Sequence, residues 1–311
     1  MNTVLLAYCR VGELMKAEDL LRDMRRNMGM IPDVVCYTTL IDGYAKIENF
    51  ERCWEIYAEC MQKDKPGQDI DEQLMSYMIR LCSKSKDPQK ALRIFNEMQL
   101  DGFVEHSKPY NSIMMACSSH IMYAPRTIEY WHLMHMKDIE PDQVTYVAVF
   151  KACAKLGDIQ TAYDVLHELK LKNGIMNQHI FNQLIRVYAG ACKNGTEIPE
   201  DRINTYCDDA WALYEQMQEM PESETSVQVL NSLVYLYSVA YKPHEIEAKV
   251  LPQYALHKIP YDENTYAHLS KMYLEMRDLD KVVELFDKSQ EAGLKPIRTL
   301  ASSYLEAGLR K

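Results

Sequence analysis

The fold of this chain is decided by residues 31–44, which read IPDVVCYTTLIDGY. Apolar residues in this stretch recur at the spacing of one helical face and end at Tyr44. Residues 46–49 interrupt the spacing, and a second apolar face starts at Cys53 with the pattern i, i+3, i+4 and i+7. A Lys-Pro-Gly stretch at residues 65–67 ends it. The sequence therefore predicts an antiparallel pair of helices joined by a tight turn.

The same unit recurs about every 35 residues, a period typical of helical repeat proteins. Equivalent positions in successive first helices are Tyr8, Tyr44, Cys82, Cys117, Cys153, Tyr188, Tyr237 and Tyr273. Seven steps separate them, and only the step of 49 residues from Tyr188 to Tyr237 departs from the range 35 to 38. Such a chain is a solenoid, in which each unit buries its apolar face against its neighbours. This architecture favours binding along an extended surface over catalysis.

Composition fits a helical chain but argues against a simple nucleic-acid binder. The 311 residues are 47% hydrophobic, and glycine (11) and proline (12) are scarce. No apolar run approaches the 18 residues that a membrane span needs, so none is expected. The formal net charge of −10 is a poor footprint for RNA binding, unless basic residues gather on one surface.

No residue pattern predicts a catalytic or metal centre. Nine cysteines occur without a CxxC pair, and Cys82, Cys117 and Cys153 hold one position in successive repeats, which predicts buried packing residues in a reducing compartment. His132 and His135 lie three residues apart but lack a third ligand, so surface histidines are the simpler interpretation. We therefore expect no metal, no cofactor and no enzymatic activity.

The repeat strings resemble the pentatricopeptide-repeat (PPR) family. Residues 31–44, the stretch EPDQVTY at 140–146 and the second-helix stretch KALRIFNEM at 90–98 carry this resemblance, whereas the tryptophan-leucine-glycine start of tetratricopeptide repeats is missing. The resemblance implies an all-α, right-handed α-solenoid of about eight helix-turn-helix repeats. Both ends fall out of register, which predicts a fragment of a longer chain.

The register of the resemblance divides the chain into repeats of unequal length. The expected PPR solenoid covers 1–297, as repeats at about 1–33, 34–71, 72–106, 107–142, 143–177, 178–226, 227–262 and 263–297. A partial terminal helix at 298–311 follows. The sixth repeat is longer than the others, and its residues 190–206 are expected to form an insertion loop.

The resemblance also implies which residues read RNA bases. In the family the fifth and the last residue of a repeat contact one base edge. The expected pairs are Asn2 with Asp33, Asn111 with Asp142 and Asn231 with Asp262 for uracil, and Thr38 with Asp71 for guanine. Ser76 with His106 has no clear base, and Asn182 with Ser226 is cytosine-like. Val147 and Ala267 cannot hydrogen-bond a base edge, so the fifth and eighth repeats are not expected to read a base.

Two alternatives stay open for these positions. Asparagine and threonine start helices well and aspartate ends linkers, so each residue alone is also explained by helix capping. In addition, the family brackets bases with apolar residues at the second repeat position. Val35 and Val144 fit this pattern, and the residues that depart from it are Gln73, Lys108, His179, Gln228 and Asn264.

A basic residue closes the first helix in four repeats. In the family this position faces the RNA backbone, and the expected phosphate contacts are Arg10, Lys46, Lys84 and Lys155. Cations near helix C-termini are also favoured by the helix dipole, which is the competing explanation. Because the row continues as Gly190, Val239 and Glu275, RNA affinity is expected in the first five repeats.

The leading hypothesis is an organellar RNA-binding PPR protein, mitochondrial rather than plastid. Passive capture of single-stranded mRNA or rRNA would guide RNA processing, stability or translation. The alternative is a structural subunit of a large assembly such as the mitochondrial ribosome, acting through contacts with other proteins. The net charge of −10 favours this alternative.

Overall fold

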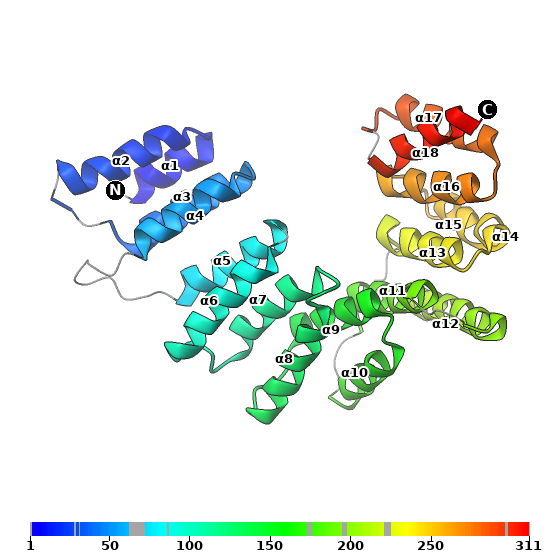
Figure 1. Ribbon diagram of the computed structural model, residues 1–311, viewed down its shortest axis with the longest axis horizontal. Helices are drawn as coiled ribbons and strands as arrows, with labels where there is room; N and C mark the ends of the chain where they lie inside the picture. The colour runs from blue at the N-terminus through cyan, green and yellow to red at the C-terminus, as the bar shows by residue number, and fades with distance from the viewer. Residues whose placement is uncertain are drawn as a thin grey trace. The chain divides into compact units, whose positions relative to one another are not determined.

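The computed structural model describes residues 2–27, 29–30, 32–61, 72–85, 87–172, 176–194, 198–220, 225–295 and 298–310. These residues form helices and turns, with no β-strand among them (Figure 1), so the expected all-α fold of paired helices is confirmed. They fall into two compact units. The first comprises Met1–His120 and Met136–Glu140, and the second comprises Ile121–His135 and Pro141–Lys311. The hand of the superhelix stays a prediction.

The first unit stacks four first helices in sequence. They are α1 (Asn2–Val11), α3 (Val34–Lys46), α5 (Glu72–Ser85) and α7 (Ser107–Ser118). Each of these helices packs against the next one in the row. The second helices are α2 (Leu14–Arg26), α4 (Phe50–Cys60) and α6 (Pro88–Leu100), and each packs against the first helix of its own repeat.

The second unit continues the same arrangement. Its first helices are α9 (Gln143–Leu156), α11 (Gln178–Asn194), α13 (Val227–Val239) and α16 (Glu263–Glu275), which pack successively, and α18 (Arg298–Arg310) packs on α16. The second helices are α8 (Ala124–Met136, in this unit up to His135), α10 (Ile159–Leu171), α12 (Glu200–Gln218) and α17 (Leu279–Glu291). In the seventh repeat the second helix is divided into α14 (Pro243–Glu245), the π-helix η1 (Ile246–Val250) and α15 (Leu251–Leu256).

Short polar side chains cap the start of seven of these helices. Asp33, Asp142 and Asp262 cap first helices by accepting hydrogen bonds from backbone N–H groups of the first turn. Second helices are capped in the same way by Asn49, Asp87, Asp158 and Asp278. The capping explanation is therefore correct for Asp33, Asp142 and Asp262, and their reading of bases stays a prediction.

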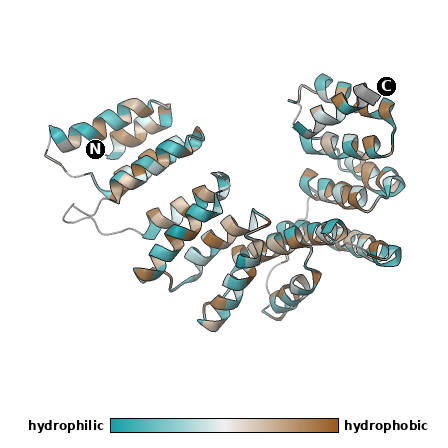
Figure 2. Cartoon of the chain, viewed as in Figure 1, coloured by the Kyte–Doolittle hydropathy of each residue, from teal (hydrophilic) through white to brown (hydrophobic). Residues whose placement is uncertain are grey.

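The residues of the periodic ladder form the core of each unit. Tyr44, Tyr188, Tyr237 and Tyr273 are at most 6% exposed, and the ladder cysteines Cys82, Cys117 and Cys153 are 1% exposed or less. All nine cysteines are free thiols. Hydrophobic and hydrophilic residues lie on different sides of the helices (Figure 2), as a stack of amphipathic helices requires.

The prediction of an insertion loop at residues 190–206 is wrong. Residues up to Asn194 continue α11, and α12 starts at Glu200, so the extra length of the sixth repeat lengthens both helices. Gly190 lies inside α11 against α9, where an added Cβ would come within 2.0 Å of the Ala154 carbonyl oxygen. This glycine allows two helices to approach closely.

The π-helix in the seventh repeat has a local cause. The Leu251 N–H donates to the Ile246 carbonyl, five residues back. Pro252 follows directly and has no N–H to donate to a preceding carbonyl, so the regular α-helical ladder cannot run through this turn. Tyr254 lies just beyond it, in α15.

Candidate functional site

The side chains expected to read bases all lie near the start of a first helix. They are Asn2 in α1, Thr38 in α3, Ser76 in α5, Asn111 in α7, Asn182 in α11 and Asn231 in α13. Asn111, Asn182 and Asn231 are buried, with 7%, 7% and 8% exposure. The other three are partly exposed. Their common helical position follows from the repeat, but their surroundings differ.

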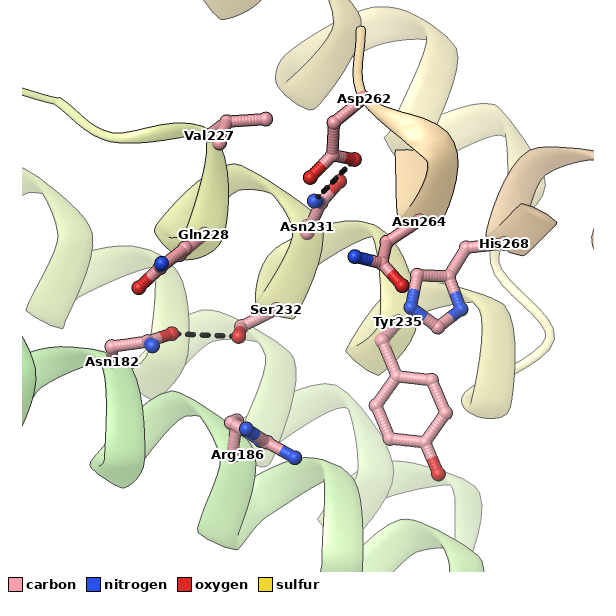
Figure 3. A pocket seen from close by; sticks show the side chains of 10 residues that line it. All are labelled: Asn182, Arg186, Val227, Gln228, Asn231, Ser232, Tyr235, Asp262, Asn264 and His268. Atoms are coloured by element: carbon pink, nitrogen blue, oxygen red, sulfur yellow. Dashed lines mark hydrogen bonds between the residues drawn. The ribbon is translucent and has the colours of Figure 1, made fainter. Parts of the chain in front are cut away.

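Asn231 and Asp262 form the best-ordered pair. The Asn231 Nδ2 donates to Asp262 Oδ1 at 2.9 Å, as Figure 3 shows. The Asn231 Oδ1 accepts from the Tyr254 hydroxyl at 2.8 Å and from the Thr265 hydroxyl at 2.7 Å. One hydrogen-bond network therefore joins the residue expected to read a base, the last residue of the same repeat and two flanking hydroxyls.

Asp262 is held in this network as a carboxylate. Burial alone would raise its pKa, but hydrogen bonds from the Thr265 backbone, from Asn231 and from the Thr265 and Asn264 side chains together lower it. The Thr265 N–H reaches Asp262 Oδ1 at 2.7 Å, within a capping box at the start of α16. Helix capping thus fixes the charge that faces Asn231.

Asn2 and Asp33 repeat the arrangement in the first unit. The Asn2 Nδ2 lies 3.3 Å from Asp33 Oδ2, and the Cys36 thiol donates to Asn2 Oδ1 at 2.8 Å. Asp33 also accepts from the Cys36 N–H at 2.9 Å. Burial would raise the pKa of Asp33, but the hydrogen bonds from Cys36 and Asn2 lower it.

Asn182 has a different partner from the one expected. Its Oδ1 accepts from the Ser232 hydroxyl at 2.6 Å, across the contact between α11 and α13 (Figure 3). Ser226, the last residue of the sixth repeat, is the N-cap of α13 and makes no side-chain capping bond. The polar partner is therefore supplied by the next first helix instead of the linker.

The second and third repeats present less polar surface at the reading position. The Thr38 hydroxyl donates to the Val34 carbonyl at 2.8 Å, and its expected partner Asp71 lies outside the described residues. The Ser76 Oγ is buried without a hydrogen-bond partner among the described residues. His106 instead contacts Glu72 at 3.1 Å. The structure shows no hydrogen bond between Ser76 and His106, and the pairing of Thr38 with Asp71 stays a prediction.

The residues of the fourth pair are each well placed within their own unit. Asn111 is buried in α7 of the first unit. Asp142 caps α9 of the second unit, where it accepts from the N–H groups of Val144 and Thr145 at 2.8 and 3.0 Å. Asp142 therefore has the same capping role as Asp33 and Asp262.

The reading positions of the sixth and seventh repeats open into a pocket of about 400 Å³. In Figure 3 the Asn231–Asp262 pair lies at one end and the exposed Arg186 at the other. His268 and Tyr235 form a further wall, with their ring centroids 5.3 Å apart. Burial lowers the pKa of His268 and so favours its neutral form. The pocket combines amide, carboxylate, aromatic and cationic groups.

The four expected phosphate contacts are exposed at the ends of their first helices. Arg10, Lys46, Lys84 and Lys155 lie in the last turns of α1, α3, α5 and α9. The Lys46 Nζ forms an ion pair with Asp42 at 2.7 Å, which reduces its availability to a phosphate. The Lys155 carbonyl accepts from the Asn194 side chain at 2.9 Å, so the long α11 packs over the end of α9.

Sequence reasoning missed the cations that lie one helical turn nearer the expected reading positions. Four repeats have one, four residues after the fifth position: Arg80 in α5, Lys151 in α9, Arg186 in α11 and Lys271 in α16. Burial lowers the pKa of Lys151, and the nearby positive charges of Arg186 and Lys155 lower it further. A comparison of this one position across repeats would have found them.

The described ranges contain neither a metal-binding cluster nor a membrane-spanning helix. Those residues contain no group of three or more His, Cys, Asp or Glu side chains that would hold a metal ion. His135 instead contacts Glu168 at 3.2 Å. Of the helices that the structure describes, none is long and apolar enough to cross a membrane.

Family models of helical repeats match the N-terminal 177 residues. Residues 1–46 match a model described as the PPR repeat family, and residues 35–64 match the PPR repeat. Residues 60–177 match the pentacotripeptide-repeat region of PRORP.

Three curated relatives from Arabidopsis thaliana illustrate the similarity. A pentatricopeptide repeat-containing protein is 23% identical over 297 residues, which cover 94% of this chain and 39% of the relative. A second, named as mitochondrial, is 22% identical over 287 residues, covering 91% and 29%. A third, named as chloroplastic, is 32% identical over 102 residues, covering 32% and 12%. The chain thus spans at most about half the length of the first curated relatives.

Two solved structures are similar to this chain at low identity. The maize pentatricopeptide repeat protein PPR10 is 18% identical, with a TM-score of 0.48, and the match covers 98% of this chain and 41% of PPR10. The nuclear proteinaceous RNase P 2 of A. thaliana is 15% identical, with a TM-score of 0.45, covering 66% of this chain and 42% of that one.

Proposed function

This chain belongs to the pentatricopeptide-repeat family, and from that premise we propose that it binds single-stranded RNA along its row of first helices. The observation that carries the proposal is the Asn231–Asp262 pair in a pocket that also contains Arg186. An amide and a carboxylate can hydrogen-bond a base edge, and a guanidinium can neutralise a phosphate. Together they fit one nucleotide.

The paired repeats would favour uracil. Its edge offers an acceptor oxygen beside an N–H donor, which complements an amide N–H beside a carboxylate. The Asn2–Asp33 and Asn231–Asp262 pairs present this combination. We propose the same preference for Asn111 with Asp142, and guanine for Thr38 with Asp71.

The RNA backbone would follow cations in each of the two units. Arg10, Lys46 and Lys84 serve the first repeats. In the second unit, Lys151, Lys155 and Arg186 place three positive charges where a phosphate would relieve their mutual repulsion. This cluster extends the expected RNA path beyond the fifth repeat and toward the Asn231 pocket.

We propose capture of RNA without catalysis, in an organelle. The matched model at residues 60–177 describes a repeat region, and the solenoid supplies a long surface to hold a strand. Relatives named as mitochondrial and as chloroplastic support an organellar location, of which we favour the mitochondrion. By occupying the captured RNA, the protein would affect its processing, stability or translation.

Salt-dependent binding of a pool of short single-stranded RNAs of random sequence tests the proposal. Three neutralised phosphates give a slope of about −2 in a plot of log affinity against log salt, from about −0.7 for each. Replacing Lys151, Lys155 and Arg186 together by Ala should flatten the slope by that amount. The matched control replaces Lys170, Lys172 and Lys288 by Ala, which makes the same charge change on α10, its C-terminal end and α17.

The control variant should keep the salt slope of the natural chain. Equal loss of slope in both triple variants would contradict the proposed path, because only net charge would then matter. Absence of RNA binding by the natural chain would contradict RNA capture itself.

A second candidate is a structural subunit of a large assembly such as the mitochondrial ribosome. The formal net charge of −10 favours it, because an acidic surface repels an RNA backbone everywhere except at local basic clusters. Gentle purification of the native complex separates the two proposals. Stoichiometric partner proteins that persist after ribonuclease treatment would favour the subunit.

A further inference from the structure

We propose that Tyr254 is a positioning residue that holds the Asn231 amide with its N–H toward the pocket, so that the seventh repeat selects uracil over cytosine. The inference rests on the proposed RNA binding and adds a second-helix residue to the reading mechanism. Tyr254 lies in α15, 23 residues after Asn231, and its hydroxyl reaches the amide from behind the first-helix row.

The orientation of the amide follows from the partner on one side. Asp262 is a carboxylate in this network and can only accept hydrogen bonds. The Asn231 atom that lies 2.9 Å from Asp262 Oδ1 must therefore be the nitrogen. Its opposite atom, which faces Tyr254 and Thr265, must be the oxygen.

Two hydroxyl groups face the oxygen on the other side. The hydroxyls of Tyr254 and Thr265 lie 2.8 and 2.7 Å from Asn231 Oδ1. Thr265 has one hydrogen to give, and Asp262 Oδ1 lies only 2.9 Å from the same hydroxyl. Tyr254 is therefore the more dependable donor, and at 2% exposure it does not exchange this bond for water.

Packing holds the Tyr254 ring in place. Its ring meets that of Tyr261 edge to face, with centroids 4.8 Å apart. Tyr261 in turn packs on Tyr266 at 5.6 Å. The aromatic row fixes where the hydroxyl points, so the hydrogen bond costs little conformational freedom when RNA binds.

The Asn231 side chain therefore presents a hydrogen-bond donor to a ligand. Of the two Asn231 N–H groups, one is used by Asp262 and the other remains for a ligand, while the oxygen faces the hydroxyls of Tyr254 and Thr265. Such a group donates to an oxygen of uracil. Cytosine has an amino group, a hydrogen-bond donor, at the corresponding position. This amino group would face the Asn231 N–H, and neither donor would have an acceptor.

The experiment sequences the RNAs bound from a pool of random single strands, using the full chain and three variants. Asn231→Ala identifies the RNA position that the seventh repeat reads, as the position where a uracil preference disappears. Tyr254→Phe should lower the uracil-to-cytosine ratio at that same position by roughly twofold to tenfold, the net worth of one hydrogen bond, and leave other positions unchanged. The control is Tyr237→Phe, whose hydroxyl donates to the Cys207 carbonyl away from the pocket.

The outcomes separate this inference from the proposed function. A ratio measured within one sample does not depend on the folded fraction, so partial destabilisation of Tyr254→Phe cannot imitate the effect. If Asn231→Ala removes a preference that Tyr254→Phe retains in full, positioning by Tyr254 is overturned and base reading stands. If Asn231→Ala changes no position, base reading by this repeat is overturned and the inference with it.

Discussion

The first and the seventh repeats contain the same polar device with different support. In both, the asparagine proposed to read a base donates to the repeat-ending aspartate 31 residues later, and the residue 34 positions after the asparagine donates to its amide oxygen. At Asn2 that donor is the thiol of Cys36, and the amide–carboxylate distance is 3.3 Å. At Asn231 the donor is a hydroxyl, a tyrosine is added, and the distance is 2.9 Å. Sequence repetition therefore sets the pairing, whereas the surroundings set how firmly it is held.

A second device also recurs in both units. A ladder tyrosine donates to a glutamate 26 residues earlier, in Tyr44 to Glu18 and in Tyr273 to Glu247. A cation 34 residues after each glutamate completes the contact. Glu18 is 5% exposed and bonded by both Arg52 and Arg22, whereas the side chain of Glu247 is 41% exposed. The buried version should matter more for stability than the exposed one.

The largest expected effect breaks the second device. Arg52→Ala removes hydrogen bonds of 2.9 and 2.8 Å to Glu18 and leaves a buried carboxylate with Arg22 and Tyr44 alone. We expect the free energy of unfolding of the first unit to fall by about 3 kcal/mol, the scale for breaking a buried ion pair. Lys281→Ala, the matched change at Glu247, should cost less than about 1 kcal/mol because that pair is solvated. Denaturant unfolding of both variants measures the contrast, and equal costs would contradict it.

Acid titration sharpens the same contrast. Hydrogen bonds from Arg52, opposed by burial and aided by Tyr44, lower the pKa of Glu18 to about 2 from an ordinary value of 4.5. A lowered folded pKa contributes stability above the unfolded pKa, and this contribution is lost as pH falls from about 4.5 to about 2. It amounts to about 3 kcal/mol at neutral pH. Glu18→Gln should flatten this acid limb of the stability curve, and Glu247→Gln should change it less.

Helix contacts provide a third contrast between the units. Gly190→Ala would place a Cβ 2.0 Å from the Ala154 carbonyl oxygen, which belongs to a helix backbone and cannot yield easily. We expect a loss of about 1–3 kcal/mol in stability from this overpacking. At Gly43 the nearest atom is the mobile Leu14 Cδ2 at 2.7 Å, so Gly43→Ala should cost less. As a control, Gly308→Ala meets no atom within 4 Å and should stabilise α18 slightly.

The smallest expected difference is between alanine substitutions at the two proposed reading sites. Asn231→Ala should weaken binding of RNAs with uracil at its position by about 1–3 kcal/mol, the scale of a specific base contact. Asn2→Ala should fall at the lower end of that range, since its amide is held by a weaker donor and a longer bond to Asp33. Competition binding with uracil and cytosine oligomers measures both. A larger effect at Asn2 would show that support of the amide does not govern reading.

Repeat spacing was sufficient to predict the paired helices and their core. The ladder from Tyr44 to Tyr273 is buried as expected, because a residue at a fixed position in a stacked unit meets the same neighbours each time. The same reasoning failed at residues 190–206, where the extra length of the sixth repeat was expected to form a loop. Extra residues look alike in sequence whether they form a loop or lengthen a helix, and the packing of α11 on α9 decides between the two.

For the site, the sequence alone determined which asparagines and aspartates share a repeat position, because that register is counted along the chain. It did not determine what stands behind them. Tyr254 reaches Asn231 from the second helix of its repeat, after a π-turn, and Ser232 replaces Ser226 as the partner of Asn182. Arg186 lines the same pocket from the preceding repeat. These contacts join residues through the packing of helices, and hydrogen bonds across a packed interface depend on distances that no local pattern encodes.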